Sequence, residues 1–387
     1  MPAAKLPFHV PIPSSSIIVT RPILDKAKAR KLKCNYELLM TQRYTSTLNI
    51  LRVGSGNFGG AVVFPGGKLE EQSDYKLASK YVDGNIDSQT ALKICSLRET
   101  FEETGLDLLQ GLKNDSTNAT GSGSVDIGTH KDAQYNNKKG IFSINDLSLF
   151  AHWITPTHIP KRFDTYFYML NLPQELELDS SNQEDQNMHN LIHHQIYKSN
   201  DSYKLQSNEV VKLFWSTPGQ YLDDFHSNKE NKIILYPPQY YMLNAIAQFA
   251  TFQELKKYVD THSHLVEPIT PALLKQKPPP SSDGNRDAEA KKKQQKQQVL
   301  LFNGDYQYPG HTSQSPIIES STPNAPSKST SADNAAQPLH RIYLNAGMHK
   351  LRLVENMGKI PQRLHSPHAQ QSVHALACSS STPISKL

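Results

Sequence analysis

The sequence predicts a mixed α/β layer fold, and three observations lead to that fold class. Short β-branched and aromatic runs alternate with segments of helical periodicity, the pattern of strands and helices packed in layers. Several of these runs are apolar throughout, as in a sheet that is covered on both faces. Polar segments rich in Asn, Ser, Gly and Gln interrupt the pattern and hold too few apolar residues to form a core. The chain is therefore expected to carry an α/β core with polar loop insertions.

Strands are expected where the β-branched and aromatic residues are densest. The expected strands are SSIIV (15–19), YELLMTQR (36–43), FGGAVVF (58–64), SLFAHWIT (148–155), FDTYFYML (163–170) and VVKLFW (210–215).

Helices are indicated by periodicity together with capping residues. The segment 91–104 has helical apolar spacing and stops at Gly105, a residue favoured just past a helix end. Thr217 and Pro218 look like an N-cap followed by Pro at the first helical position. Pro238 is expected to open the next helix, and Thr251 with Glu254 forms a capping box for another.

The composition divides the chain into an ordered core and flexible flanks. The expected parts are an N-terminal extension (1–13), the α/β domain (14–266, with inserts at about 112–140 and 179–207), a disordered linker (267–338), a hairpin that returns to pack on the domain (339–357) and a flexible tail (358–387). The fold class thus includes a long disordered C-terminal region.

Composition also excludes several classes of protein. Hydrophobic residues make up 37% of the 387 residues, below the usual range of roughly 45–50%. No run of about 18 apolar residues is present, and no apolar secretion segment follows the N-terminus, so neither a membrane protein nor a secreted one is expected. The net charge of +5 is modest, and the one obvious lysine run of the chain lies in the glutamine-rich stretch AEAKKKQQKQQ. Such a run is usually a solvated segment, so nucleic-acid binding is not expected as the main function. Three scattered cysteines predict reduced thiols.

Three carboxylates gather on one predicted helix. Glu99 and Glu103 are four residues apart and share a face, with Glu102 beside them. Like charges at this spacing repel, so the arrangement needs a compensating positive charge. The alternative is a solvated helix face on which Arg98 and Glu102 form an i,i+4 pair.

A glycine turn makes the alternative weaker. The residues FPGG (64–67) end an apolar strand, and glycine permits a close approach of the backbone. A strand, a glycine turn and an acidic helix together offer oxygen ligands of the kind that Mg²⁺ or Mn²⁺ prefers, and these ions usually accompany substrate phosphates.

Gly67 with RETFEETGL (98–106) resembles the Nudix box, the signature of Nudix diphosphohydrolases. The resemblance implies an α/β/α sandwich with a mixed sheet and hydrolysis of a diphosphate. The second half of the box matches at every fixed position. Thirty positions separate Gly67 from Arg98, 17 more than in the family pattern, and the middle Glu of the box is open among Glu70, Glu71 and the segment around Thr90.

An inserted box of this kind is similar to the peroxisomal coenzyme A diphosphatases of the family. The segments around LMTQR (39–43), GAVVFPGG (60–67), 153–170 and 209–218 also resemble that branch, although Tyr44 and the long spacing from Arg43 to Gly60 depart from it. In all, the resemblance covers residues 14–265. It implies cleavage of coenzyme A or acyl-coenzyme A to 3′,5′-ADP and (acyl-)4′-phosphopantetheine.

The expected metal ligands are Glu99 and Glu103, with Glu102 as a further ligand or as the carboxylate that orients water. The resemblance adds the Gly67 carbonyl. Arg98 is expected to hold a carboxylate in place, because its fork suits bidentate pairing. Glu209 precedes an apolar strand, where many Nudix enzymes carry another acid; a surface glutamate is the alternative.

Arg43, Lys161 and Arg162 are the candidates to meet the 3′-phosphate of coenzyme A, and ordinary surface cations are the alternative. Trp153, with its neighbours on the predicted strands, is expected to pack in the core rather than to stack on substrate. Two other functions remain open: hydrolysis of another nucleoside diphosphate derivative (ADP-ribose, NADH or a capped nucleotide), or a non-catalytic Nudix module that binds through its tails.

The printed sequence ends in Ser385-Lys386-Leu387, which matches the peroxisomal address S-K-L. It predicts recognition by the peroxisomal import receptor and a location in the peroxisomal matrix.

Overall fold

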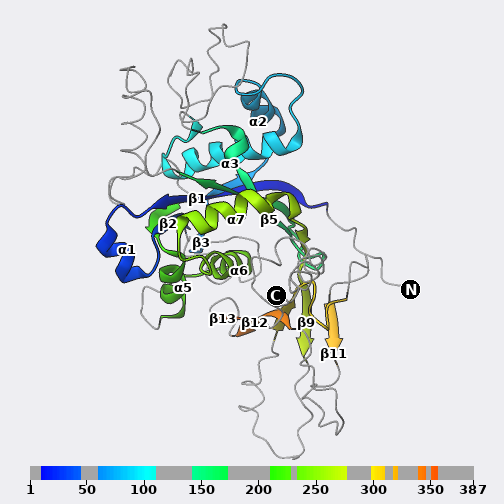
Figure 1. Cartoon of the computed structure of the whole chain (residues 1–387). Coiled ribbons are helices and arrows are strands. Elements are labelled where there is room, and N and C mark those ends of the chain that lie inside the picture. The colour runs from blue at the N-terminus through cyan, green and yellow to red at the C-terminus, as the bar shows by residue number, and fades with distance from the viewer. Residues whose placement is uncertain are drawn as a thin grey trace, which may run out of the picture.

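A computed structural model of the chain contains two β-sheets and the helices packed on them (Figure 1). The residues that it describes are 10–44, 60–109, 142–172, 210–227, 233–276, 298–309, 317–320, 339–345 and 350–355. Both expected polar inserts, at 112–140 and 179–207, lie outside the described residues.

The larger sheet has eight strands and is mixed. Its strands are β1 (Ile12–Pro22), β2 (Tyr36–Arg43), β3 (Val62–Val63), β4 (Gly66–Lys68), β5 (Ser148–Ile154), β6 (Phe163–Asn171), β7 (Val210–Ser216) and β8 (Pro268–Ile269). The order is β3-β2-β1-β6-β5-β8, with β4 also paired to β1 and β7 to β2. Strand β1 pairs in parallel with β6 and antiparallel with β2 and β4.

Helices cover both faces of this sheet, because its strands alternate apolar side chains between the two sides. Ile17 and Val19 of β1 pack in one cluster with residues of α2 and α3, whereas Ile18 packs in the other with α5, α6 and α7. The helices are α1 (Lys26–Leu32), α2 (Glu71–Ala78), α3 (Ser88–Thr104), α5 (Pro218–His226), α6 (Pro237–Ile246) and α7 (Phe252–His262), and short 3-10 turns span Ile144–Asp146 and Ser263–Leu265. The architecture is the α/β/α sandwich that the sequence predicts.

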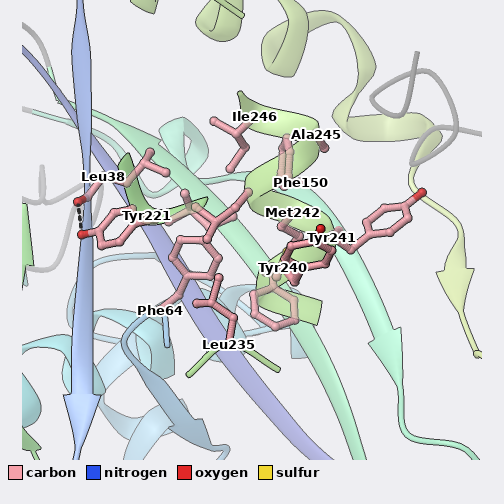
Figure 2. Packing of buried hydrophobic residues seen from close by; sticks show 14 of the residues in the cluster. Leu38, Phe64, Phe150, Tyr221, Leu235, Tyr240, Tyr241, Met242, Ala245 and Ile246 are labelled. Carbon is pink, nitrogen blue, oxygen red and sulfur yellow. Dashed lines mark hydrogen bonds between the residues drawn. The ribbon is translucent and has the colours of Figure 1, made fainter. Parts of the chain in front are cut away.

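The α5–α7 side of the core is rich in aromatic side chains that also carry polar atoms. Figure 2 shows Tyr240, Tyr241 and Met242 projecting from α6 toward the strands. The Tyr221 hydroxyl donates to the Leu38 carbonyl at 3.0 Å, which lets a buried phenol satisfy its hydrogen bond (Figure 2).

Most of the expected elements are found close to their predicted bounds. Thr217 accepts a hydrogen bond from the Gln220 amide and caps α5, and Thr251 forms the predicted capping box of α7 with Glu254. Helix α6 begins at Pro237, one residue before the predicted start. Helices α1 and α2 were not anticipated.

The segment 267–338 is not only a linker, since its described parts contribute strands. A five-stranded sheet with the order β11-β9-β10-β12-β13 is built from β9 (Ala272–Gln276), β10 (Gln298–Leu301), β11 (Ile317–Ser320), β12 (His340–Asn345) and β13 (Lys350–Glu355). Strands β12 and β13 form the expected antiparallel hairpin. The other three are short apolar runs whose signal is diluted by the polar sequence around them.

The second sheet shares the hydrophobic core of the first. Leu300, Phe302 and Ile342 belong to the same buried cluster as Trp153 and the α6 side chains. Trp153 and Phe302 meet edge-on, with ring centroids 5.8 Å apart. The predicted domain boundary at 266 therefore cuts through a continuous core.

No helix among the described residues is long and apolar enough to cross a bilayer.

Candidate active site

Helix α3 carries the three clustered carboxylates and is capped at both ends. Asp87 accepts a hydrogen bond from the Thr90 amide at the N-terminus. The helix ends at Gly105, whose φ of 71° lies in the left-handed region that glycine tolerates best. These caps fix where the helix starts and stops, and so set which turn carries the carboxylates.

Gly66 and Gly67, which the sequence placed in a turn, are the first two residues of strand β4 and lie directly against this helix. Residues 64–67 keep the name glycine turn below. A Cβ on Gly67 would fall 2.3 Å from the Cδ atom of Glu99, and a Cβ on Gly66 would fall 2.3 Å from the Ser15 carbonyl oxygen. At Gly66 the collision is with backbone atoms of β1, so this position requires glycine. At Gly67 it is with the flexible end of the Glu99 side chain, which would have to move. The missing side chain at Gly67 leaves room for the Glu99 carboxylate to rest on the backbone.

Glu103 is the most enclosed of the three carboxylates. Its side chain is 4% exposed and forms an ion pair with the Arg43 guanidinium at 3.0 Å. Its other oxygen accepts from the Gly66 amide at 3.3 Å. Arg43 also donates to the Gly66 carbonyl at 3.1 Å, so one arginine holds the glycine turn and the acidic helix together.

Arg98 is the second cation of the site. Its Nε and Nη2 atoms donate to the two oxygens of Asp74, at 2.7 and 3.2 Å. Its Nη1 donates to Glu99 at 3.1 Å and to Glu102 at 3.1 and 3.2 Å. Burial opposes the charge on Arg98, but the hydrogen bonds and charge of Asp74, with the charge of Glu99, outweigh it and raise the pKa. The guanidinium therefore stays charged.

Glu99 and Glu102 differ in their surroundings. Burial, together with the charge of Glu102, raises the pKa of the Glu99 carboxyl, which Arg98 only partly offsets. The Glu102 side chain is 45% exposed, against 18% for Glu99. Glu102 is thus the carboxylate of the three that water reaches most freely.

The donor chemistry fits a hard divalent cation. Carboxylates and backbone carbonyls are the ligands that such ions prefer, and the bare backbone of Gly67 leaves space beside Glu99. Within the described ranges, no three acidic, histidine or cysteine side chains already surround one point. Arg43 pairs with Glu103, and Arg98 pairs with Glu99.

The known proteins most similar to this chain include Nudix hydrolases, although no family model matches it. A protein named putative nudix hydrolase 7 from Caenorhabditis elegans is 24% identical over 77% of this chain and 80% of its own length. A protein named acyl-coenzyme A diphosphatase NUDT19 from Xenopus laevis is 24% identical over 59% of this chain and 64% of its own length. The protein of the same name from Homo sapiens is 26% identical over 49% of this chain and 47% of its own length. This chain is similar to Nudix hydrolases.

The match spans less than two thirds of the length of these two NUDT19 proteins. Among solved structures, a Nudix hydrolase from Alicyclobacillus acidocaldarius superposes on 64% of this chain and 96% of its own length, with a TM-score of 0.39 and 20% identity.

The structure brings some of the predicted site residues together. Arg43, Gly67, Arg98 and the three glutamates meet around one turn. Arg43 contacts Glu103 and the Gly66 carbonyl, and its contact with a substrate phosphate stays a prediction. Glu209 lies outside the described residues.

Lys161 and Arg162 lie on the connection between β5 and β6. Arg162 donates through Nε to the Thr155 carbonyl at 2.9 Å, and the Lys161 ammonium lies 5.4 Å from the centroid of the Phe163 ring. Strand register brings this connection to the same end of the sheet as the glycine turn, since β1 pairs with both Phe163 and Lys68.

Asp74 was missed by sequence reasoning. It is fully buried in α2, within the 30 residues that separate Gly67 from Arg98. The sequence did contain a signal for it. Asp74 precedes Leu77 by three residues and Ala78 by four, so it lies on the apolar face of a short helix. A charge on such a face predicts a buried partner.

Proposed function

We propose that this protein is a Nudix hydrolase that requires Mg²⁺ or Mn²⁺ and cleaves the diphosphate of coenzyme A or acyl-coenzyme A to 3′,5′-ADP and (acyl-)4′-phosphopantetheine. The observation that carries the proposal is the set of three carboxylates against a bare glycine turn, in a chain whose relatives include proteins named acyl-coenzyme A diphosphatases. A chain that only binds ligands has no need for three mutually repelling carboxylates.

Glu99, Glu103 and the Gly67 carbonyl are the groups that would hold the metal ion, with Glu102 as a further ligand. When bound, such an ion supplies positive charge to the diphosphate oxygens and makes a neighbouring water more acidic. The Glu99 carboxylate lies where a Cβ on Gly67 would be, so it packs against the backbone of this residue.

Glu102 is the best placed of the three to orient the attacking water. Its carboxylate is the most exposed, and Arg98 holds it from one side through Nη1. A fixed carboxylate that faces solvent can accept a proton from water as the water attacks phosphorus. Glu209 remains a proposed second acid for this role.

Arg98 keeps two carboxylates in a fixed arrangement, so that no reorganisation is needed when substrate arrives. The Arg98 guanidinium donates hydrogen bonds to Asp74 on one side and to Glu99 and Glu102 on the other. Arg98 is therefore a positioning residue for the reaction.

The phosphates of the substrate would meet Lys161 and Arg162, which lie at the sheet end next to the glycine turn. Arg43 would join them only after giving up its contact with Glu103. Cations placed in this way neutralise the diphosphate and the 3′-phosphate of coenzyme A.

A substrate panel tests the proposal. Purified protein with Mg²⁺ is given coenzyme A, acyl-coenzyme A, ADP-ribose, NADH and capped nucleotide, and the products are separated by liquid chromatography. We expect 3′,5′-ADP from the coenzyme A substrates and no product after EDTA treatment. Turnover of ADP-ribose, NADH or capped nucleotide with none of coenzyme A contradicts the substrate.

We also propose that the protein is located in the peroxisomal matrix and that an import receptor binds the tripeptide Ser385-Lys386-Leu387. This tripeptide lies outside the described residues. Imaging of an N-terminally tagged protein with and without this tripeptide tests it. Equal cytosolic distribution of both forms contradicts it.

A further inference from the structure

His152 and Asp164 form a largely buried pair on the neighbouring strands β5 and β6. The Nε2 atom of His152 hydrogen-bonds the Asp164 carboxylate, and the two side chains are 10% and 30% exposed. The His152 ring also stacks on the Tyr166 ring, with centroids 4.0 Å apart and planes inclined by 20°. Because an ionised carboxylate only accepts, Nε2 is the donor in this pair. In the described part of the chain Nδ1 has no hydrogen-bond partner, so this nitrogen is left for a ligand.

Strand register places His152 on the sheet face that carries α3. Ser15 of β1 pairs with Gly67 of β4 on one side and with Tyr166 of β6 on the other. Tyr166 in turn pairs with His152. Residues that pair in this way form one row, and their side chains share a face of the sheet. Tyr166 packs against the cluster that includes Leu97 of α3, so the row faces the acidic helix.

His152 lies three strand spacings away from Gly67 along this row. At about 4.8 Å for each spacing, the two Cα atoms are roughly 14 Å apart. A side chain at this distance does not touch the atoms that react beside Glu99, and it meets a group further along the substrate instead. Coenzyme A carries a charged group of this kind, the 3′-phosphate on the ribose next to its diphosphate.

The charges around His152 favour the adenosine end of coenzyme A over the pantetheine arm. Lys161 and Arg162 lie on the connection that joins β5 to β6, and Asp164 follows Arg162 by two residues. Asp164 on one side of the imidazole and a phosphate on the other both stabilise the doubly protonated ring, in which Nδ1 donates to the phosphate. The pantetheine arm carries no charge, so these cations give it no advantage.

We propose that His152 binds the 3′-phosphate of coenzyme A, with Asp164 and Tyr166 as positioning residues that hold its ring. The inference rests on the proposed function, because it places the diphosphate beside Glu99 and Gly67. It assigns to His152 the discrimination between coenzyme A and dephospho-coenzyme A, which lacks only the 3′-phosphate. A charge-assisted hydrogen bond to phosphate is about twice as strong as a neutral one, so one such residue is enough to separate the two substrates.

The test measures kcat and KM of His152→Gln with coenzyme A and with dephospho-coenzyme A. Glutamine still donates to Asp164 but carries no positive charge. We expect KM for coenzyme A to rise about tenfold, the loss of one hydrogen bond to a charged group. Both constants for dephospho-coenzyme A should stay within about twofold of those of the native chain.

His226→Gln is the matched control. His226 is exposed at the end of α5, a helix that packs on the opposite face of the sheet. This variant should leave KM for both substrates within about twofold of the native values.

Tyr166→Leu tests the same site by a second route, should the substitution of the buried His152 prevent folding. It removes the ring on which His152 stacks and keeps an apolar side chain against the α3 cluster. The imidazole is then no longer held in one orientation, so KM should rise about threefold or more for coenzyme A and stay unchanged for dephospho-coenzyme A. Circular dichroism and cooperative unfolding show which variants are folded.

Three results overturn the inference and leave the proposed function standing. The first is a folded His152→Gln or Tyr166→Leu chain with the native KM for coenzyme A. The second is a KM that rises equally for both substrates, which marks a purely structural role. The third is a native chain with the same KM for both substrates. A native chain that cleaves neither substrate contradicts the proposed function, and the inference falls with it.

Discussion

Gly67 and Glu99 are in such close contact that a Cβ on the glycine would lie 2.3 Å from the glutamate's carboxylate. Gly67→Ala should therefore push the Glu99 carboxylate away from the turn and lower kcat by at least about tenfold, because the proposed carboxylate–carbonyl ligand pair is separated. Steady-state kinetics with coenzyme A measure the loss.

Gly219→Ala is the matched control. No heavy atom lies within 4 Å of a Cβ built there, and the residue sits in the first turn of α5. Alanine in a helix is about 0.5–1 kcal/mol more favourable than glycine, so this variant should be fully active and no less stable. Equal activity of the two variants would remove the case for Gly67 as part of the site.

Capping signals and local periodicity made the catalytic helix predictable. The acids, their spacing and Gly105 lie within a few residues of one another, and the helix that they predict is found. The turn predicted at Gly66 and Gly67 was wrong, because both residues pair with β1 as part of strand β4. What the sequence could not show is that Arg43 pairs with Glu103, 60 residues away, because that contact depends on how β2 meets the turn.

Two further features depend on contacts between distant segments. Asp74 lies on a short helix 24 residues before Arg98, and their contact depends on how α2 packs on α3. Strand β10 has four residues and pairs with β9 and β12 across polar sequence, which local patterns do not reveal. Strand pairing over such separations is set by the whole core and not by the run itself.

Glu103→Gln should lower kcat by about 100-fold or more while leaving the fold intact. The amide keeps one oxygen acceptor for the buried position but loses the charge that a divalent cation requires. Kinetics and thermal unfolding of this variant are compared with those of Glu71→Gln, whose side chain is exposed. Near-native turnover in Glu103→Gln would place the metal elsewhere.

Arg43→Met should show whether a divalent cation can replace the Arg43 guanidinium as the positive charge beside the Glu103 carboxylate. In EDTA, loss of the 3.0 Å ion pair leaves a buried carboxylate without that cation and should lower the free energy of unfolding by about 1–3 kcal/mol. A divalent cation can replace the missing charge, so saturating Mn²⁺ should recover most of the loss.

Urea unfolding with EDTA and with Mn²⁺ measures both values for Arg43→Met. Arg30→Met, at an exposed position of α1, is the control and should change neither value by more than about 0.5 kcal/mol. An Arg43→Met chain that Mn²⁺ stabilises no more than it does the native chain contradicts this replacement.

Cys95 should resist alkylation in the folded chain. Burial, together with the charge of Asp74, raises the pKa of its thiol, and the thiolate is the reactive form, so the reactive fraction at pH 8 is smaller than in the unfolded chain. Its Sγ donates to the Lys68 carbonyl at 3.2 Å beneath the glycine turn. Iodoacetamide labelling and peptide mass spectrometry should find Cys95 unmodified in buffer and modified in urea. Rapid labelling in buffer would mean that α3 opens readily.

Phe302 tests whether the second sheet belongs to the folded core. Its side chain is 1% exposed and its ring packs against Trp153 and Tyr241, with centroids 5.8 and 5.2 Å away. Phe302→Ala should therefore lower the free energy of unfolding by about 3–5 kcal/mol. Tyr306, four residues further on and 41% exposed, gives the control Tyr306→Ala, which should cost less than about 1 kcal/mol. If the segment after residue 266 were only a linker, both variants would unfold at the same urea concentration as the native protein. We expect one cooperative unfolding transition whose urea midpoint is lowered in Phe302→Ala and unchanged in Tyr306→Ala. This result would mean that the α/β sandwich and the second sheet unfold together.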